Sequence, residues 1–404
     1  MQKRTIVMAA LAAAVLASVA IASPAAAWQH HSESDAPDLR FDPVATLADG
    51  LTSPLSFDVD RNGDAVLSQN FLGELTGVTA DDVSTTLATA AAPGQEIGAV
   101  STRRGTVYFT QNDQPNGVAQ LMSLEEGGTP KLLADLGAYE AANNPDQVNT
   151  YGFSDLAPAC AAQIDPNGPA GPPTYTGTVD SHPYASLALR DAIYVADAGG
   201  NDILRVGYDG EISTVAVLPP TEPVTVTADV AAAFGFPDCV AGHGYAFEPV
   251  PTDVERGEHS ALYVSSLPGG PEDASLGLRG SVFSVDPESG DSELLATGFA
   301  GATGIAVDKD TGVVLVAELF GGADGTGQIS AVATRSGDVL ATYAVPSPAA
   351  LELRDGLVYA TTNAFVPDAS GNPQPIGQLT TWQLTDQNDG QCWGDDGEHE
   401  EEQN

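Results

Sequence analysis

Three carboxylates occupy positions from which they could share a cation. Glu96 and Asp253 stand at the starts of two apolar, strand-like stretches, and Glu318 follows a third. Carboxylates gathered around one axis repel one another, so a buried set requires a cation or a shared proton. The pattern therefore predicts a metal site formed by these three acids, with calcium as the ion that such oxygen ligands suit. The alternative is that each acid is hydrogen-bonded separately or faces water.

A wider set of polar side chains predicts a ligand-binding site near the same strand ends. It combines residues at strand entries, residues that follow strands and one histidine in a long insertion: His182, Tyr184, Asp197, Asp253, Glu318 and His243. His182 and His243 could act together as an acid–base pair, or each could be a loop residue that makes one hydrogen bond. The sequence contains no G-x-S-x-G elbow, H-E-x-x-H motif or glycine-rich phosphate loop, so no catalytic residue is assigned.

The segment DVDRNGD, residues 58–64, imitates the start of an EF-hand calcium loop. Such a loop requires a bidentate acid at its twelfth position, and that position is Gln69 here. Other copies of the same repeat place hairpin turns in this register. We therefore interpret the segment as a hairpin turn, with calcium binding as the alternative.

One phrase recurs six times: an apolar stretch, a turn, and a second apolar stretch that ends in a small and a polar residue. The six copies span residues 56–69, 98–111, 185–197, 253–266, 304–318 and 350–362. A β-hairpin that recurs every 40–50 residues or so is typical of a β-propeller. Alignment of the copies places six residues at one repeat position: Val66, Tyr108, Tyr194, Tyr263, Leu315 and Tyr359.

The two ends of the repeat region predict how the ring closes. Residues 44–51 resemble the segments that close the other repeats, whereas the last repeat has no such segment of its own. We therefore predict an all-β, six-bladed β-propeller over residues 44–385, whose last blade is closed by the N-terminal strand. Residues 28–43 are predicted to be a linker, and residues 386–404 a disordered acidic tail.

The first 27 residues have the layout of a secretory signal peptide. Lys3 and Arg4 precede an apolar run over residues 6–22, and three alanines end at residue 27. The alternative is a membrane anchor, but the run is short and no second apolar span follows. We expect a secreted or extracytoplasmic protein with no membrane span.

The formal net charge of −41 limits the partners of this protein. Such a field repels nucleic acid and anionic membranes. A solvated acidic surface accounts for the charge, with a calcium-rich protein as the alternative. We expect a monomer whose partner is a small molecule or a protein of the cell envelope.

Three cysteines in an oxidising compartment predict one disulfide and one remaining thiol. Cys160 and Cys239 both lie in long insertions between repeats, and Cys392 lies in the acidic tail. A Cys160–Cys239 bridge that ties the two insertions together is the preferred pairing. Dimerisation through Cys392 is then open.

Several segments resemble the ScyD/ScyE family of secreted propeller proteins, named for proteins associated with scytonemin biosynthesis. They include AYEAANNPD at residues 138–146, VADAGGNDILRV at 195–206 and LYVSSLPGGPEDASLGLRG at 262–280. The second of these also resembles an NHL-type repeat. The matching segments lie between residues 41 and 385. The resemblance implies the propeller fold and an extracytoplasmic address, but it implies no particular reaction.

The chain is also distantly similar to the gluconolactonase/regucalcin propellers, which are metal-dependent hydrolases. Their metal triad is a Glu at the first inner strand, an Asn in S-N-G and an Asp in P-D-G. Here residues 53–55 contain no Glu, residues 181–183 read Ser-His-Pro, and Asp253 stands one place late. A one-residue slip turns a strand side chain to the other face. Hydrolysis by that mechanism is therefore not expected.

These observations favour a binding or scaffolding module whose ligand lies over the mouth of the channel. The first alternative is a calcium-assisted lactonase or esterase that uses Asp253, Glu318 and His182. The second is a cell-envelope protein that interacts with a partner through its rim and acidic tail.

Overall fold

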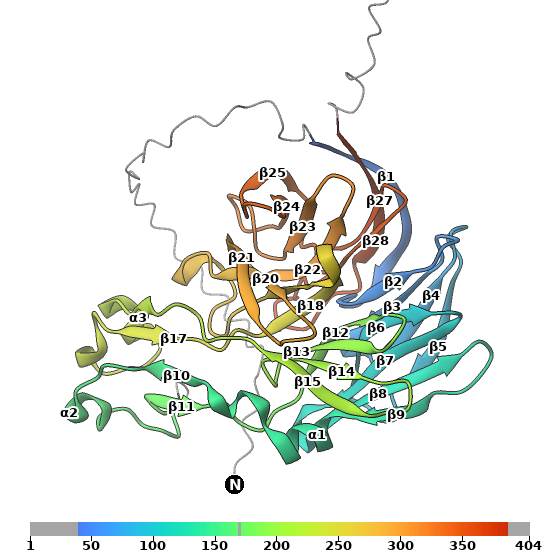
Figure 1. The fold of residues 1–404 in the computed structure, drawn as a ribbon. Helices are drawn as coiled ribbons and strands as arrows, with labels where there is room; N and C mark the ends of the chain where they lie inside the picture. The colour runs from blue at the N-terminus through green and yellow to red at the C-terminus, as the bar shows by residue number, and fades with distance from the viewer. Residues whose placement is uncertain (1–38, 169–170, 387–404) are drawn as a thin grey trace, which may run out of the picture.

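The protein is built almost entirely from four-stranded antiparallel sheets. The structure is a computed structural model that describes residues 39–168 and 171–386 (Figure 1). Seven sheets are present in this part of the chain. The predicted signal peptide lies outside the described residues, and so does the predicted acidic tail with Cys392, apart from Asp386, which ends strand β28 (Gly377–Asp386).

Six of the sheets follow the six sequence repeats, and we call them the repeat sheets. Five of them contain four consecutive strands each. These strands are β2 (Phe57–Val59), β3 (Ala65–Gln69), β4 (Glu74–Val78) and β5 (Ser84–Thr89); β6 (Glu96–Arg103), β7 (Thr106–Asp113), β8 (Val118–Glu125) and β9 (Lys131–Asp135); β12 (Pro183–Ala188), β13 (Ile193–Asp197), β14 (Asp202–Val206) and β15 (Ile212–Val217); β18 (Pro251–Arg256), β19 (Leu262–Ser266), β20 (Gly280–Val285) and β21 (Ser292–Phe299); β22 (Ala302–Asp308), β23 (Val313–Glu318), β24 (Gln328–Ala333) and β25 (Val339–Ala344).

The sixth repeat sheet joins the two ends of the described chain. Its order is β1 (Leu39–Leu51), β28 (Gly377–Asp386), β27 (Leu357–Thr362) and β26 (Leu351–Arg354). Strand β1 therefore begins within the predicted linker and corrects its boundary. The physical reason is burial: the ring of Phe41 stacks on that of Trp382 at 4.9 Å between centroids.

The predicted repeat alignment is confirmed by the strand register. Tyr194, Tyr263 and Tyr359 lie opposite Leu187, Glu255 and Glu352 at matching positions of their first strands. The hairpin turn between the first two strands of the second repeat also has the backbone conformation that its residues favour. Arg104 and Gly105 have φ of 51° and 80°, as a two-residue type I′ turn requires.

The first strands of all six repeat sheets meet at one central cavity. The cavity is lined by residues of β6, β12, β18, β22 and β26, and by residues 55–57, the last of which begins β2. Its volume is about 10 Å³, which is room for about one water molecule. Each first strand contacts the next along the chain, and β26 contacts β2. The axis of the molecule is therefore packed with side chains.

The seventh sheet, which we call the accessory sheet, lies in two insertions and was not predicted. Its order is β11 (Thr174–Thr176), β10 (Thr150–Phe153), β17 (Gly244–Ala246) and β16 (Val224–Thr225). Figure 1 shows it at the lower left, beside the repeat sheets. The α-helices are α1 (Leu136–Asn143), α2 (Pro158–Ala161) and α3 (Ala228–Ala233). Short 3-10 helices span Asn70–Leu72, Gln114–Asn116, Pro145–Val148, Asp238–Val240, Glu258–Ser260 and Ala274–Leu276.

The predicted disulfide between Cys160 and Cys239 is confirmed, with 5.8 Å between the two Cα atoms. It joins α2 in the first insertion to the second insertion, 79 residues further along the chain. Behind it, Phe153 and Tyr245 pack edge to face at 5.0 Å. The accessory sheet therefore has its own small core and a covalent cross-link. No helix among residues 39–168 and 171–386 is long and apolar enough to cross a membrane.

Candidate functional site

The polar residue that follows the second strand of a repeat holds the loop before the first strand. Asp197 is 1% exposed, and its Oδ1 accepts hydrogen bonds from the backbone N–H groups of His182, Gly199 and Gly200. Its Oδ2 accepts one from the Ser181 hydroxyl at 2.5 Å. The fold thus engages both oxygens of this predicted ligand residue.

Glu318 occupies the equivalent position and likewise accepts hydrogen bonds with both carboxylate oxygens. Its Oε2 accepts a hydrogen bond from the backbone N–H of Ala300 at 2.8 Å. Its Oε1 accepts from the Gln328 amide and the Ser330 hydroxyl. In the first repeat, the side chain of Gln69 accepts from the backbone N–H of Thr52 at 2.9 Å. The repeated polar position therefore fixes the loops at this end of the molecule.

Asp253 ties its own strand to the next repeat sheet. One of its oxygens accepts from the backbone N–H of Val254 and the other from that of Ile305 on β22, both at 2.8 Å. Asp58 on β2 bonds in the same way to Thr102 on β6. Burial raises the pKa of Asp253 to about 7, and these hydrogen bonds only partly oppose that rise.

Two further carboxyl groups line the central cavity, and they were missed from the sequence. Glu255 and Glu352 face the cavity together with Asp253. Burial and then neighbouring carboxylates raise the pKa of both groups well above the ordinary value. The repeat alignment could have identified them, because both residues lie opposite the aligned tyrosines of their repeats.

The predicted residues His182 and Glu96 meet at the start of the first strands. His182 Nε2 lies 2.9 Å from Glu96 Oε2, and the two side chains are 20% and 25% exposed. Burial alone would lower the pKa of His182, but the hydrogen bond and charge of Glu96 outweigh it and raise that pKa. The pair therefore favours an imidazolium beside a carboxylate.

An apolar cluster includes the start of β12 at Tyr184, two residues after His182. Tyr184 is buried there with Leu55 and Leu319. Three partly buried aromatic side chains pack on the cluster: Phe71, Phe320 and Phe365. Burial raises the pKa of the Tyr184 hydroxyl above its ordinary value, so this group stays a neutral hydrogen-bonding phenol.

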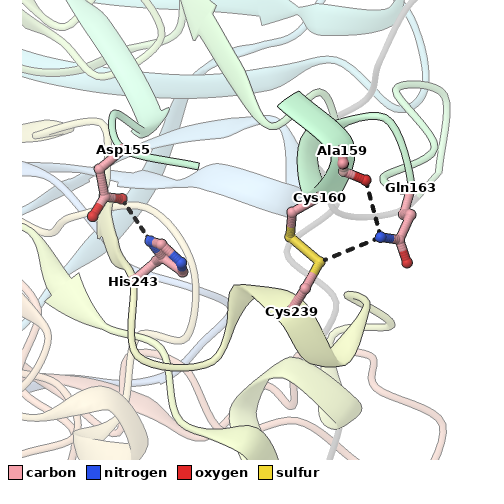
Figure 2. The surroundings of a disulfide bond; sticks show 6 residues. All are labelled: Asp155, Ala159, Cys160, Gln163, Cys239 and His243. Carbon is pink, nitrogen blue, oxygen red and sulfur yellow. Dashed lines mark hydrogen bonds and ion pairs between the residues drawn. A yellow bond between two sulfur atoms is a disulfide. The ribbon is translucent and has the colours of Figure 1, made fainter. Parts of the chain in front are cut away.

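His243 lies with the accessory sheet and pairs with a different carboxylate. Its Nδ1 is 3.0 Å from Asp155 Oδ1, and Figure 2 shows this pair apart from the disulfide. In the same view, the Gln163 amide donates to Cys239 Sγ and to the carbonyl of Ala159 on α2. The two histidines are thus engaged separately, and neither is the other's hydrogen-bond partner.

The three predicted metal ligands have separate partners. Glu96 bonds to His182, Asp253 bonds to backbone N–H groups, and Glu318 holds a loop. Within the described residues, no group of three His, Cys, Asp or Glu side chains is arranged to hold a metal ion. The calcium-like segment forms the β2–β3 hairpin, in which Asp60 accepts from the backbone N–H groups of Asn62 and Asp64.

A second group of buried acids lies where α1 packs against the third repeat sheet, and it too was missed. Glu140, Asp146 and Asp202 are 3%, 0% and 1% exposed. The side-chain amide of Asn201 donates to Asp146 at 2.9 Å. Burial, and then the charges of Asp197 and Asp146, raise the pKa of Glu140 to about 8. Two of the segments that carry the ScyD/ScyE resemblance supply these acids, so they are in contact in the fold.

Comparison with known proteins supports the fold and leaves the activity open. No protein-family model matches the chain, and no curated protein matches it. The PQQ-bound aldose sugar dehydrogenase of Streptomyces coelicolor is 15% identical with a TM-score of 0.53, over 87% of this chain and 100% of that one. A streptogramin B lyase is 13% identical with a TM-score of 0.46, over 86% and 97%. A gluconolactonase of Xanthomonas campestris is 13% identical with a TM-score of 0.46, over 88% and 99%.

The sheets and these structural neighbours define the class of this protein: it is an all-β protein with a β-propeller fold. At such low identities the likeness concerns the fold alone. Membership of the ScyD/ScyE family stays a prediction.

Proposed function

We propose that the protein is a secreted, six-bladed β-propeller that binds a small ligand at the end of the channel marked by His182 and Glu96. The six first strands line one cavity and contact one another in cyclic order, which supports six blades in a closed ring. The pairing of β1 with β28 supports closure of the last blade by the N-terminal strand. The disulfide supports an oxidising, extracytoplasmic location.

The observation that carries this proposal is a partly exposed ion pair close to a cluster that contains aromatic side chains. The raised pKa of His182 favours its charged form, so the pair presents an N–H donor and a carboxylate acceptor. Glu96 acts electrostatically on the Tyr184 hydroxyl, and Phe71, Phe320 and Phe365 pack on the cluster that contains Tyr184. Ligand sites commonly combine apolar surface with a few convergent polar groups. A small molecule with a polar group on a flat apolar or sugar-like ring fits this combination.

The other predicted ligand residues support the site in different ways. We assign contact with the ligand to His182 and Tyr184, and positioning of the loops to Asp197 and Glu318. Asp253 lies deeper, where it joins two strands. His243 would contact only a ligand that extends to the accessory sheet.

A thermal-shift screen of sugars, sugar acids and aromatic acids, followed by calorimetry, tests this proposal. The variants are His182→Gln and Glu96→Gln, and the matched control is Glu125→Gln, whose side chain is 74% exposed. Loss of one charged hydrogen bond costs about 1.5–3 kcal/mol, which weakens binding by roughly 10- to 100-fold. Ligands that bind both variants as tightly as the control would place the site elsewhere.

A calcium-assisted hydrolase is the second candidate, because a carboxyl group with a pKa of about 7, such as Asp253, suits acid–base chemistry. A screen of lactones and aryl esters, with and without calcium, separates the two functions. Activity that is lost in Asp253→Ala and Glu318→Ala, but retained in Glu125→Gln, would overturn the binding proposal. Capture of one partner from an envelope fraction would instead favour an interaction module.

A further inference from the structure

Basic side chains gather at one end of this strongly acidic protein. The chain has only 14 Lys and Arg residues against 55 Asp and Glu residues. Nevertheless, the turn between the first and second strands of every repeat sheet carries a basic residue at or beside it: Arg61, Arg104, Arg190, Arg256, Lys309 and Arg354. A distribution this regular is not expected of a general acidic surface.

These six turns lie at the same end of the channel. Ser56 and then Asp58 bond to Val100 and then Thr102 along β6, and Thr252 and then Asp253 bond to Ala302 and then Ile305 along β22. Contacts that advance together along both segments show that these neighbouring first strands run in the same direction. Arg354 also donates to the backbone carbonyl of Val59 at 2.6 Å, which joins the last turn to the first. We call this end the turn face; it is opposite the strand entries where His182 lies.

The turn face is hollowed at the fourth and fifth repeats. A cavity of about 520 Å³, which we call the basic hollow, is lined by Arg256, Lys309 and Arg335 together with His259 and Ser260. None of the three cations forms an ion pair with any acid in residues 39–168 and 171–386. The one acid in the lining, Glu258, accepts a hydrogen bond from the Thr334 hydroxyl at 2.9 Å.

The three cations therefore have no ion-pair partner of their own, and Glu258 is the one acid that lines the hollow with them. Burial and then the positive charge of Arg256 lower the pKa of Lys309, while Glu255 opposes this only in part. Like charges held close together are unfavourable unless an opposite charge lies between them. Arginine and lysine side chains that line one hollow are groups that bind phosphate and carboxylate oxygens.

We propose that the basic hollow is a second binding site, which takes a ligand bearing two or more oxyanion groups, phosphate or carboxylate. The row of basic turns beyond the hollow favours a short anionic chain, such as an acidic oligosaccharide, over a single small ion. The net charge of −41 opposes long polyanions by repulsion, which limits the length of the chain that binds. This site is independent of the ligand site proposed at His182.

Calorimetric titration with two probes tests the proposal. Pyrophosphate represents a compact ligand with two phosphate groups, and a short oligogalacturonate represents an anionic chain. The test variant combines Arg256→Gln, Lys309→Gln and Arg335→Gln. The matched control combines Arg40→Gln, Lys131→Gln and Arg205→Gln; it changes the net charge equally, and the last two residues are in surface ion pairs.

We expect at least one probe to bind at low salt, and the test variant to bind it at least tenfold more weakly than the control. Binding should also weaken steeply as salt is raised, because exposed charges are screened. Tighter binding of the oligogalacturonate identifies an anionic chain, and tighter binding of pyrophosphate identifies a compact ligand. Equal binding by both triple variants, or no binding of either probe in the millimolar range at low salt, would overturn the proposal. Melting curves of both variants confirm that each is folded.

Discussion

Replacement of Glu140 by glutamine should remove part of the pH dependence of stability. Glu140 lies on α1 and is 3% exposed, and its pKa rises from 4.5 to about 8 in the fold. Between these two values the folded state binds a proton that the unfolded state has released. Stability contributed by this group is therefore greatest below pH 4.5 and declines as pH rises to about 8.

The size of the effect follows from the shift. One pKa unit corresponds to about 1.36 kcal/mol, so a rise from 4.5 to about 8 corresponds to about 5 kcal/mol as an upper value. Glutamine imitates the protonated acid and cannot ionise. Its oxygen can accept the hydrogen bond from the backbone N–H of Asp180 that Glu140 accepts now. Its amide can donate towards the neighbouring carboxylates.

Urea unfolding of the wild type and Glu140→Gln at pH 5, 7 and 9 measures this. We expect similar stability at pH 5 and a variant that is more stable by several kcal/mol at pH 9. Other buried acids titrate in both proteins, so the difference between the two curves isolates Glu140. Glu125→Gln, at an exposed position, is the control and should show no such change. A difference between wild type and Glu140→Gln that is the same at pH 5 and pH 9 would refute the reasoning.

Three further predictions concern the disulfide, the loop contacts and the ion pair. Replacing Cys160 and Cys239 by serine should cost about 4 kcal/mol, because the bridge closes a loop of 79 residues; hydrogen exchange should show the loss mainly in the accessory sheet. Asp197→Ala leaves several buried N–H groups without an acceptor and should cost roughly 3 kcal/mol in urea unfolding, and an equally stable variant would contradict this. The NMR titration midpoint of His182 should lie above 6.5 and fall in Glu96→Gln; the pair should stabilise the fold fully below pH 6.5 and lose this effect as pH passes the raised pKa. An unchanged midpoint in Glu96→Gln would show that another group sets the pKa.

The repeat architecture could be predicted because each hairpin carries its own local signal. An alternating strand, a glycine turn such as Arg104–Gly105 and a second strand recur with one period. The accessory sheet could not be predicted in this way. Its strand β16 has only two residues, and β10 and β17 pair across nearly a hundred residues of chain. Strands this short show no measurable alternation, so only their tertiary packing defines them.

The candidate site was predicted in part for a similar reason. The sequence placed His182 and Glu96 at strand entries, which converge wherever hairpins repeat around an axis, but it assigned them to different sites and did not predict their contact. The roles of Asp197 and Glu318 were not found, because a hydrogen bond to a loop N–H depends on how that loop folds back. Burial of Glu140 depends on where α1 packs, and nothing in the spacing of the segment indicates it.

The pairing of β1 with β28 has a consequence for how the chain is made. Leu39 lies opposite Asp386, so the earliest described strand finds its partner only after more than three hundred further residues have been synthesised. Five repeat sheets can form in succession from neighbouring segments as they emerge, but the sixth cannot. Until β28 has been made, β1 presents an unpaired edge, the kind that invites aggregation. The newly made protein therefore carries one open sheet edge until synthesis of the described residues is almost complete.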